Sequence, residues 1–303
     1  MFRPWRSFPL MVAAGLVVGL ATGGFPAAYS KTVQQVMLIL AMGFSLTEIS
    51  FRGISPKGEA RGVALAFAMS YGVLGGLLVL TGLLASEPQI RSGWILMAAV
   101  PPAVAVVPIT SLLRGDVRRS LISDAVLYLL GLATVPGLSL LFLGASVPVG
   151  DLLIQTVLLI GLPILASRPL RMWPRIHEVR PTAVSLSFFF LVVAIAGSTR
   201  DSLLGRPDLL LGLSALAILR TFGLGLLLFG IGLLSAWSRE NRIAAIVFAG
   251  FKNLGLTTVL AFSFFGPLAS LPSIVSLIFE ILWMSSLPFL FRTPAKGVME
   301  IAE

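Results

Sequence analysis

The chain has 303 residues, of which 57% are hydrophobic and 12% are charged, and its mean hydropathy is +0.99. Soluble domains are roughly 45–50% apolar and about 25% charged, so this composition excludes a soluble globular protein and predicts one membrane domain over residues 1–303. The absence of cysteine excludes disulfides and thiolate ligands, and the single His177 excludes a histidine cluster, so no metal or other cofactor is expected.

Ten apolar segments follow one another along the chain, each near the ~20 residues that cross ~30 Å of hydrocarbon. They lie at residues 9–29, 33–51, 62–85, 93–113, 120–144, 149–167, 182–199, 209–236, 243–265 and 268–291. The sequence therefore predicts an all-α polytopic protein with ten transmembrane helices. The first segment also has the basic start and apolar centre of a cleaved signal peptide, but its removal would leave nine spans.

The basic residues alternate between the loops. Sixteen Lys and Arg residues flank the even-numbered spans and the N-terminus, whereas only Lys31, Arg91, Arg200 and Arg206 occupy the alternate loops. Because cytoplasmic loops collect Lys and Arg, we expect both termini in the cytoplasm and the chain in the inner (plasma) membrane. The net charge of +9 then reflects topology and not a nucleic-acid partner.

Two spans have helix-breaking residues near their centres. The fourth span has Pro101, Pro102 and Pro108, and the ninth has Gly250, Asn253 and Gly255. Proline and glycine are common in membrane helices, but interruptions at matching positions of two five-helix halves are typical of an inverted-repeat transporter with a midplane site. The halves are expected at about 9–144 and 149–291.

Three segments resemble the bile acid:sodium symporter family: MGFSLTEISF (42–51), AAVPPAVAVVPITSLLRGDVRRSL (98–121) and GFKNLGLTTVLAFSFFGPLASLP (250–272). The resemblance implies a panel of helices 1, 2, 6 and 7 and a core of helices 3–5 and 8–10. In that core, interrupted helices 4 and 9 cross. It also implies transport of small organic anions by alternating access.

The chain departs from the family pattern at the positions that bind sodium in its relatives. A family Ser-Asn pair falls on Val106 and Val107, a ligating acid on Phe248 and a ligating amide on Lys252. Ser120 matches a family serine, and a family threonine falls on Asp124. Valine and phenylalanine side chains supply no oxygen ligand, so the resemblance implies degenerate sodium sites.

Four charged residues lie inside the predicted spans: Asp124, Arg220, Lys252 and Glu280. Because a buried charge is costly in a membrane, we expect each to have a partner. The predicted pairs are Asp124 with Lys252, in direct contact or through one water, and Arg220 with Glu280. The first pair is either a permanent replacement for sodium or a group that titrates during transport. Asn253 and Thr110 are candidate substrate-binding groups.

These observations predict a secondary transporter of a small organic anion that is sodium-independent, either facilitated or proton-coupled. Two alternatives stay open: a membrane sensor on a degenerate carrier scaffold, and a sodium-coupled symporter with a shifted site. Arsenite carriers rely on a thiol, which this chain lacks. A lone loop His177 and one in-span aspartate provide no hydrolytic constellation, so an enzyme is not expected.

Overall fold

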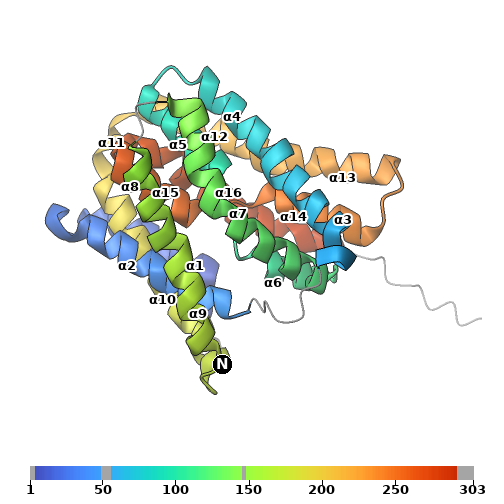
Figure 1. The fold of residues 1–303 in the computed structure, drawn as a ribbon. Helices are drawn as coiled ribbons and strands as arrows, with labels where there is room; N and C mark the ends of the chain where they lie inside the picture. Colours follow the sequence, from blue (N-terminus) through green and yellow to red (C-terminus); the bar gives the residue numbers. More distant parts are fainter. Residues whose placement is uncertain (1–3, 49–55, 145–147, 292–303) are drawn as a thin grey trace, which may run out of the picture.

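The computed structural model describes residues 4–48, 56–144 and 148–291, and every regular element in these ranges is helical (Figure 1). The first half contains α1 (Phe8–Thr22), α2 (Ala27–Ser45), α3 (Pro56–Phe67), α4 (Gly75–Leu84), α5 (Pro88–Ala99), α6 (Val106–Leu112) and α7 (Val117–Leu143). The second half contains α8 (Val149–Thr156), α9 (Leu162–Arg171), α10 (Ile176–Ser198), α11 (Arg200–Gly205), α12 (Pro207–Ile218), α13 (Leu224–Leu234), α14 (Arg239–Gly250), α15 (Leu254–Phe265) and α16 (Pro267–Leu290).

Six helices in the described part of the chain are long and apolar enough to cross a membrane. They are Glu59–Leu84, Val117–Leu143, Val149–Arg171, Ile176–Ser198, Pro207–Leu234 and Pro267–Leu290. Each coincides with one of the ten predicted spans. Of the other four, two are interrupted, one is the 15-residue α1, and one is α2, whose hydropathy is lowered by Lys31, Gln34 and Gln35. The count of ten spans stays a prediction.

The boundaries of the first two predicted spans are wrong by several residues. We expected a first helix to residue 29, but α1 ends at Thr22 because Gly23 and Gly24 adopt φ values of +78° and +75°. Such left-handed residues terminate helices, and glycine adopts this conformation without steric cost. Helix α2 consequently begins at Ala27, six residues before the predicted start.

Three long helices contain a π-helical turn near their middle. These turns are η3 (Ala68–Leu74) between α3 and α4, η5 (Val157–Gly161) between α8 and α9, and η6 (Leu219–Gly223) between α12 and α13. A π-turn inserts an extra residue into the helical repeat and is frequent at functional sites. Tyr71 lies within η3 and Arg220 within η6.

The helices pack in two groups (Figure 1). In the first group α10 lies against both α1 and α2, and α9 lies against α2. Helices α3–α7 and α12–α16 form the second group, in which α5 contacts α4, α7, α15 and α16. Small residues permit the closest approach: a Cβ atom at Gly19 of α1 would lie 2.7 Å from the Val193 carbonyl oxygen of α10.

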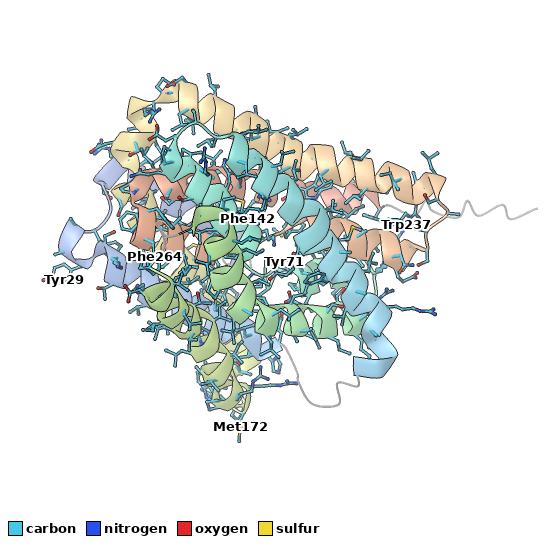
Figure 2. All side chains as sticks on the ribbon, turned by 45° about the horizontal axis from the view of Figure 1, so that its top comes forward. Tyr29, Tyr71, Phe142, Met172, Trp237 and Phe264 are labelled. Atoms are coloured by element: carbon cyan, nitrogen blue, oxygen red, sulfur yellow. The ribbon has the colours of Figure 1, made fainter. Side chains whose placement is uncertain are left out.

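The outer surface is rich in exposed apolar side chains. Leu84, Leu141 and Leu165 are 77%, 70% and 69% exposed. Figure 2 shows Tyr29 and Met172 at the periphery, whereas Tyr71 lies among the helices. Extended apolar surface on a helical protein of this hydropathy is the surface that lipid tails contact.

Candidate functional site

The first helix interruption separates α5 from α6. Helix α5 ends at Ala99, and Val100 is extended with φ −68° and ψ 154°. The residue before a proline is disfavoured in the helical region, and proline has no N–H to continue a helix. Pro101 and Pro102 therefore account for the break at residues 100–105.

The second interruption separates α14 from α15. Helix α14 ends at Gly250, and Phe251 is extended with φ −127° and ψ 118°. Asn253 starts the next segment because its side-chain oxygen accepts a hydrogen bond from the Leu256 N–H at 3.0 Å. This N-cap satisfies a donor that the helix itself cannot satisfy.

The two interruptions pair with each other. Pro102 and Lys252 form an isolated antiparallel bridge. The Asn253 N–H donates to the Pro101 carbonyl at 3.0 Å, and the Ala103 N–H donates to the Phe251 carbonyl at 3.3 Å. Backbone polar groups at membrane depth need partners within the protein, and each break supplies partners for the other.

Two of the predicted break residues lie inside helices. Pro108 is the third residue of α6, and Gly255 is the second residue of α15. The first turn of a helix has no internal partner for its N–H groups, so proline costs little there. Gly255 serves packing, since a Cβ atom at this position would lie 3.2 Å from a Leu38 methyl carbon.

Lys252 is 1% exposed and its ammonium group lies at the end of α5. Its Nζ donates to the Ala98 carbonyl at 3.0 Å and to the Val100 carbonyl at 2.9 Å, and it lies 4.2 Å from the centre of the Tyr71 ring. The last carbonyls of a helix are unpaired and carry partial negative charge. These two carbonyls and the aromatic face together make a cation site that Lys252 itself occupies.

Thr134 of α7 contacts both parts of the protein that form this cation site. Its hydroxyl donates to the Ala99 carbonyl at 2.9 Å and lies 3.1 Å from the Tyr71 hydroxyl. One side chain thus contacts both walls of the site, the end of α5 and the aromatic ring. Neither Tyr71 nor Thr134 was predicted as a site residue; the signal for Tyr71 was an aromatic residue with a hydroxyl group in the middle of an apolar span.

The predicted direct ion pair between Asp124 and Lys252 is wrong. Asp124 is 0% exposed, and neither of its carboxyl oxygens has a hydrogen-bond partner among the described residues. Lys252 instead uses backbone carbonyls, which are closer to its position at the end of α5. A contact between the two through one water stays a prediction.

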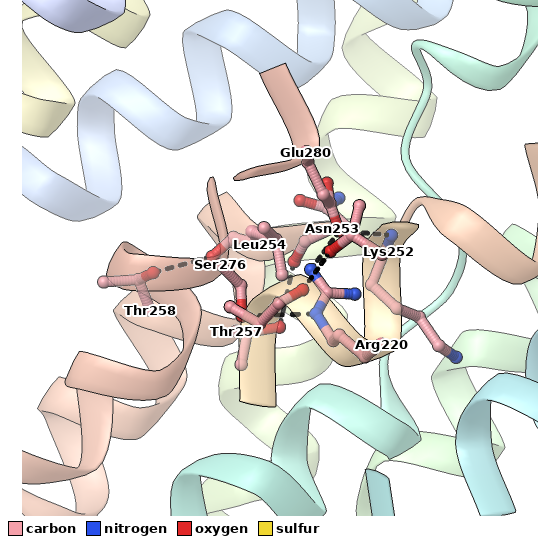
Figure 3. A network of polar contacts seen from close by, with 10 residues as sticks. Arg220, Lys252, Asn253, Leu254, Thr257, Thr258, Ser276 and Glu280 are labelled. Atoms are coloured by element: carbon pink, nitrogen blue, oxygen red, sulfur yellow. Dashed lines mark hydrogen bonds and ion pairs between the residues drawn. The ribbon is translucent and has the colours of Figure 1, made fainter. Parts of the chain in front are cut away.

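The predicted pairing of Arg220 with Glu280 is confirmed. An Arg220 terminal nitrogen lies 2.6 Å from Glu280 Oε1, and Arg220 Nε donates to Ser276 Oγ at 3.2 Å. The backbone N–H of Lys252 donates to the same Glu280 oxygen at 3.3 Å. Figure 3 shows this network at the second break, with the Lys252 side chain extending away from Arg220 and Glu280.

Of the other predicted site residues, Thr110 and Ser120 are buried in the protein interior and Asn253 lines a cavity. Thr110 is 1% exposed; its hydroxyl donates to the Val106 carbonyl at 2.8 Å and lies 3.2 Å from Ser120 Oγ, so both are hydrogen-bonded inside the protein. Asn253 donates to the Tyr128 hydroxyl at 3.0 Å and lines the cavity described below.

The positions matched to sodium ligands are buried and apolar. Val106 is 0%, Val107 6% and Phe248 1% exposed, and Val106 and Phe248 belong to one packed cluster. Their side chains contribute carbon atoms only. The described side chains at these three positions therefore offer no oxygen to a cation.

A cavity of about 430 Å³ lies between the two helix groups. Its walls come from α2, α6, α10, α16 and the break between α14 and α15, and most lining side chains are apolar, including Met42, Phe188 and Met284. Asn253 and Glu280 contribute polar atoms where the breaks meet. This volume suits a small organic molecule.

The cavity extends to charged residues at one end, where Arg6 is exposed and Glu48 and Arg180 are half-buried. Arg6, Glu48 and Arg180 line it there, and Arg180 lies 2.5 Å from Glu48. Both Arg6 and Arg180 belong to the predicted basic side of the membrane.

The apolar helices, the paired interruptions and the cavity between two helix groups define a multi-pass membrane protein. A sequence model of the sodium bile acid symporter family matches residues 33–205, which is more than half of the chain, so the protein belongs to this family, whose members are membrane transporters. The match confirms the resemblance seen in segments 42–51 and 98–121, and segment 250–272 lies beyond its end. A comparison with curated proteins gave no match.

Proposed function

We propose that the protein is a sodium-independent carrier of an organic anion that works by alternating access. The single observation that carries this proposal is the position of the Lys252 ammonium group, which fills a cation site made of two carbonyls and an aromatic ring. A tethered ammonium supplies at this site the charge that a bound ion would otherwise supply. Small organic anions are the substrate class that the family resemblance implies.

The proposed architecture is two inverted repeats of five spans, residues 9–144 and 149–291. Two features at matching positions support it. The interruptions lie in the fourth and ninth predicted spans, and the π-turns η3 and η6 lie in the third and eighth. Accordingly we assign predicted helices 1, 2, 6 and 7 to a panel and predicted helices 3–5 and 8–10 to a core.

In the proposed orientation the protein lies in the inner (plasma) membrane and both of its termini are in the cytoplasm. The excess of Lys and Arg on one side supports it. Because the cavity reaches Arg6 and Arg180 on that side, the described conformation corresponds to the inward-facing state of the carrier. The anionic group of a substrate would enter beside these two guanidinium groups.

Sodium should not be required for transport. A sodium ion within ~4 Å of a buried ammonium costs about 4 kcal/mol at an effective dielectric constant of 20, and 1.4 kcal/mol is already tenfold in affinity. We expect uptake of a panel of organic anions into proteoliposomes to be unchanged when sodium is replaced by potassium or choline at fixed pH.

A steep and saturable sodium requirement in that assay would instead support the sodium-coupled alternative with a shifted site. Binding of an anion without uptake under any imposed gradient would support the sensor alternative. Both outcomes use the same reconstituted protein, and a membrane-potential clamp excludes an indirect effect of changing the cation.

Asp124 favours proton coupling over purely facilitated movement. Its carboxyl oxygens have no partner among the described residues, and a lone buried carboxylate is strongly unfavourable, so we assign the neutral acid to the described state. The titratable groups that interact electrostatically with it are Tyr71 of η3 and Tyr128 of α7. Lys252 of the second break forms no direct pair with Asp124.

Replacing Asp124 with asparagine should preserve uptake but remove its dependence on an imposed pH gradient, because the amide copies the neutral acid and cannot release a proton. Proteoliposome uptake with and without an inward proton gradient measures the effect. The exposed Asp151→Asn variant should retain the dependence of the unmodified protein. Equal responses of Asp124→Asn and the unmodified protein would show that protons are not carried on Asp124.

A further inference from the structure

We infer that Glu280 is a substrate-recognition residue that accepts a hydrogen bond from a hydroxyl group on the organic anion. The inference rests on the proposed function, because it concerns the same cavity. It predicts a substrate with two polar ends, an anionic group beside Arg180 and a hydroxyl group at the inner wall, joined by an apolar body.

The Glu280 carboxyl group is held firmly in place. Its Oε1 accepts from Arg220 at 2.6 Å and from the Lys252 backbone N–H at 3.3 Å, while Ser276 fixes Arg220 at 3.2 Å. Arg220 is 2% exposed, so this arrangement lies inside the protein and not at a mobile surface. A carboxylate positioned in this way has little freedom to turn away from a ligand.

One oxygen of this carboxylate is available to the cavity. Both recorded hydrogen bonds use Oε1, Oε2 accepts none from the described residues, and Glu280 lines the cavity wall. Although Oε2 has no partner among the described residues, it is not one of their fully buried atoms, so part of its surface is open. It is therefore an acceptor that a bound molecule can reach.

The charge balance selects a neutral donor over a cation. Arg220 neutralises Glu280 at 2.6 Å, so the pair has no net charge with which to attract an ammonium group. An acceptor lone pair nevertheless stays on Oε2, and a hydroxyl group satisfies it without bringing a further charge into an apolar cavity. At the other end, Glu48 neutralises one of the two guanidinium groups of Arg6 and Arg180, so one net positive charge is left for the anion.

The test compares straight-chain ω-hydroxyalkanoates of eight to twelve carbons with the parent alkanoates, which differ only in the terminal hydroxyl. Because a hydrogen bond to a charged group contributes about tenfold or more in affinity, at least one hydroxy acid should bind about tenfold more tightly than its parent. Binding to the purified full chain is measured by isothermal titration.

The double variant Arg220→Met/Glu280→Met should reduce this preference to about unity while the parent acid still binds. Replacing both members of a buried ion pair by apolar side chains is often tolerated, whereas removing one member leaves the other charge unpaired. The control is Asp151→Asn, which removes an exposed carboxylate that does not line the cavity and should keep the preference.

Each outcome bears on the inference. Equal binding of all hydroxy acids and parents by the unmodified protein would overturn it and leave the proposed anion carrier intact, whereas binding of neither class would count against both. A preference that persists in the double variant also overturns it. If the double variant binds no acid, the Glu280→Gln variant is measured instead. A preference for the hydroxy acid reduced about fivefold, as expected when a neutral acceptor replaces a charged one, supports the inference. An unchanged preference contradicts it.

Discussion

Replacing Lys252 with alanine should abolish transport and destabilise the protein by about 2–6 kcal/mol, since two buried carbonyls lose their donor and each unsatisfied group costs roughly 1–3 kcal/mol. The carbonyls are those of Ala98 and Val100, and they belong to the first break. Their distortion would disturb the bridge between Pro102 and Lys252. Thermal unfolding in detergent and anion uptake into proteoliposomes measure the two effects.

Methylammonium should restore part of the lost stability in Lys252→Ala, because it brings an ammonium group back to the vacated space beside the Tyr71 ring. The exposed Lys31→Ala variant serves as the control and should behave like the unmodified protein in both assays. An unfolding midpoint and an uptake rate unaffected by Lys252→Ala would refute a structural role for the ammonium group.

Replacing Gly93 of α5 with alanine should be almost as damaging to stability and uptake as Lys252→Ala. A Cβ atom there would lie 2.1 Å from the Ala269 carbonyl oxygen of α16, so the two helices must separate. Overpacking typically costs about 1–3 kcal/mol and occasionally more, and here a rigid backbone atom is the obstacle. We expect Gly93→Ala to lower the unfolding midpoint strongly and to reduce uptake, since α5 supplies the carbonyls that hold Lys252.

Gly76→Ala is the matched control for Gly93→Ala. Gly76 also lies within a helix, but a Cβ atom there meets no other atom within 4 Å. Alanine is favoured over glycine in a helix by about 0.5–1 kcal/mol, so this variant should be neutral or slightly more stable. Equal effects of the two substitutions would mean that the contact between α5 and α16 is not limiting.

The positions of the helix breaks could be predicted because their causes are local. Pro101 and Pro102 remove backbone donors wherever they occur, and Asn253 is a favoured N-cap residue. The pairing of Arg220 with Glu280 could also be predicted, since two opposite charges in an apolar chain have few other partners. In these cases the sequence contains the whole physical reason.

The partners of Lys252 could not be predicted in the same way. They are two backbone carbonyls, which every residue has, and the ring of Tyr71, which lies in a π-turn that shifts the helical register. Periodicity assumes 3.6 residues per turn, so it misplaces side chains beyond such a turn. The opposite charges of Asp124 and Lys252 suggested an ion pair, because charged side chains are visible in a sequence. The backbone carbonyls that compete for the ammonium group are not.

The bridge between the two breaks has a consequence for biosynthesis. Its members, Pro102 and Lys252, are separated by some 150 residues of chain, so the fourth predicted span is synthesised long before the ninth. During that interval the Pro101 carbonyl and the Ala103 N–H lack the partners that they have in the finished protein. The first break therefore stays without these partners until the second half of the chain has been synthesised and the two breaks pair.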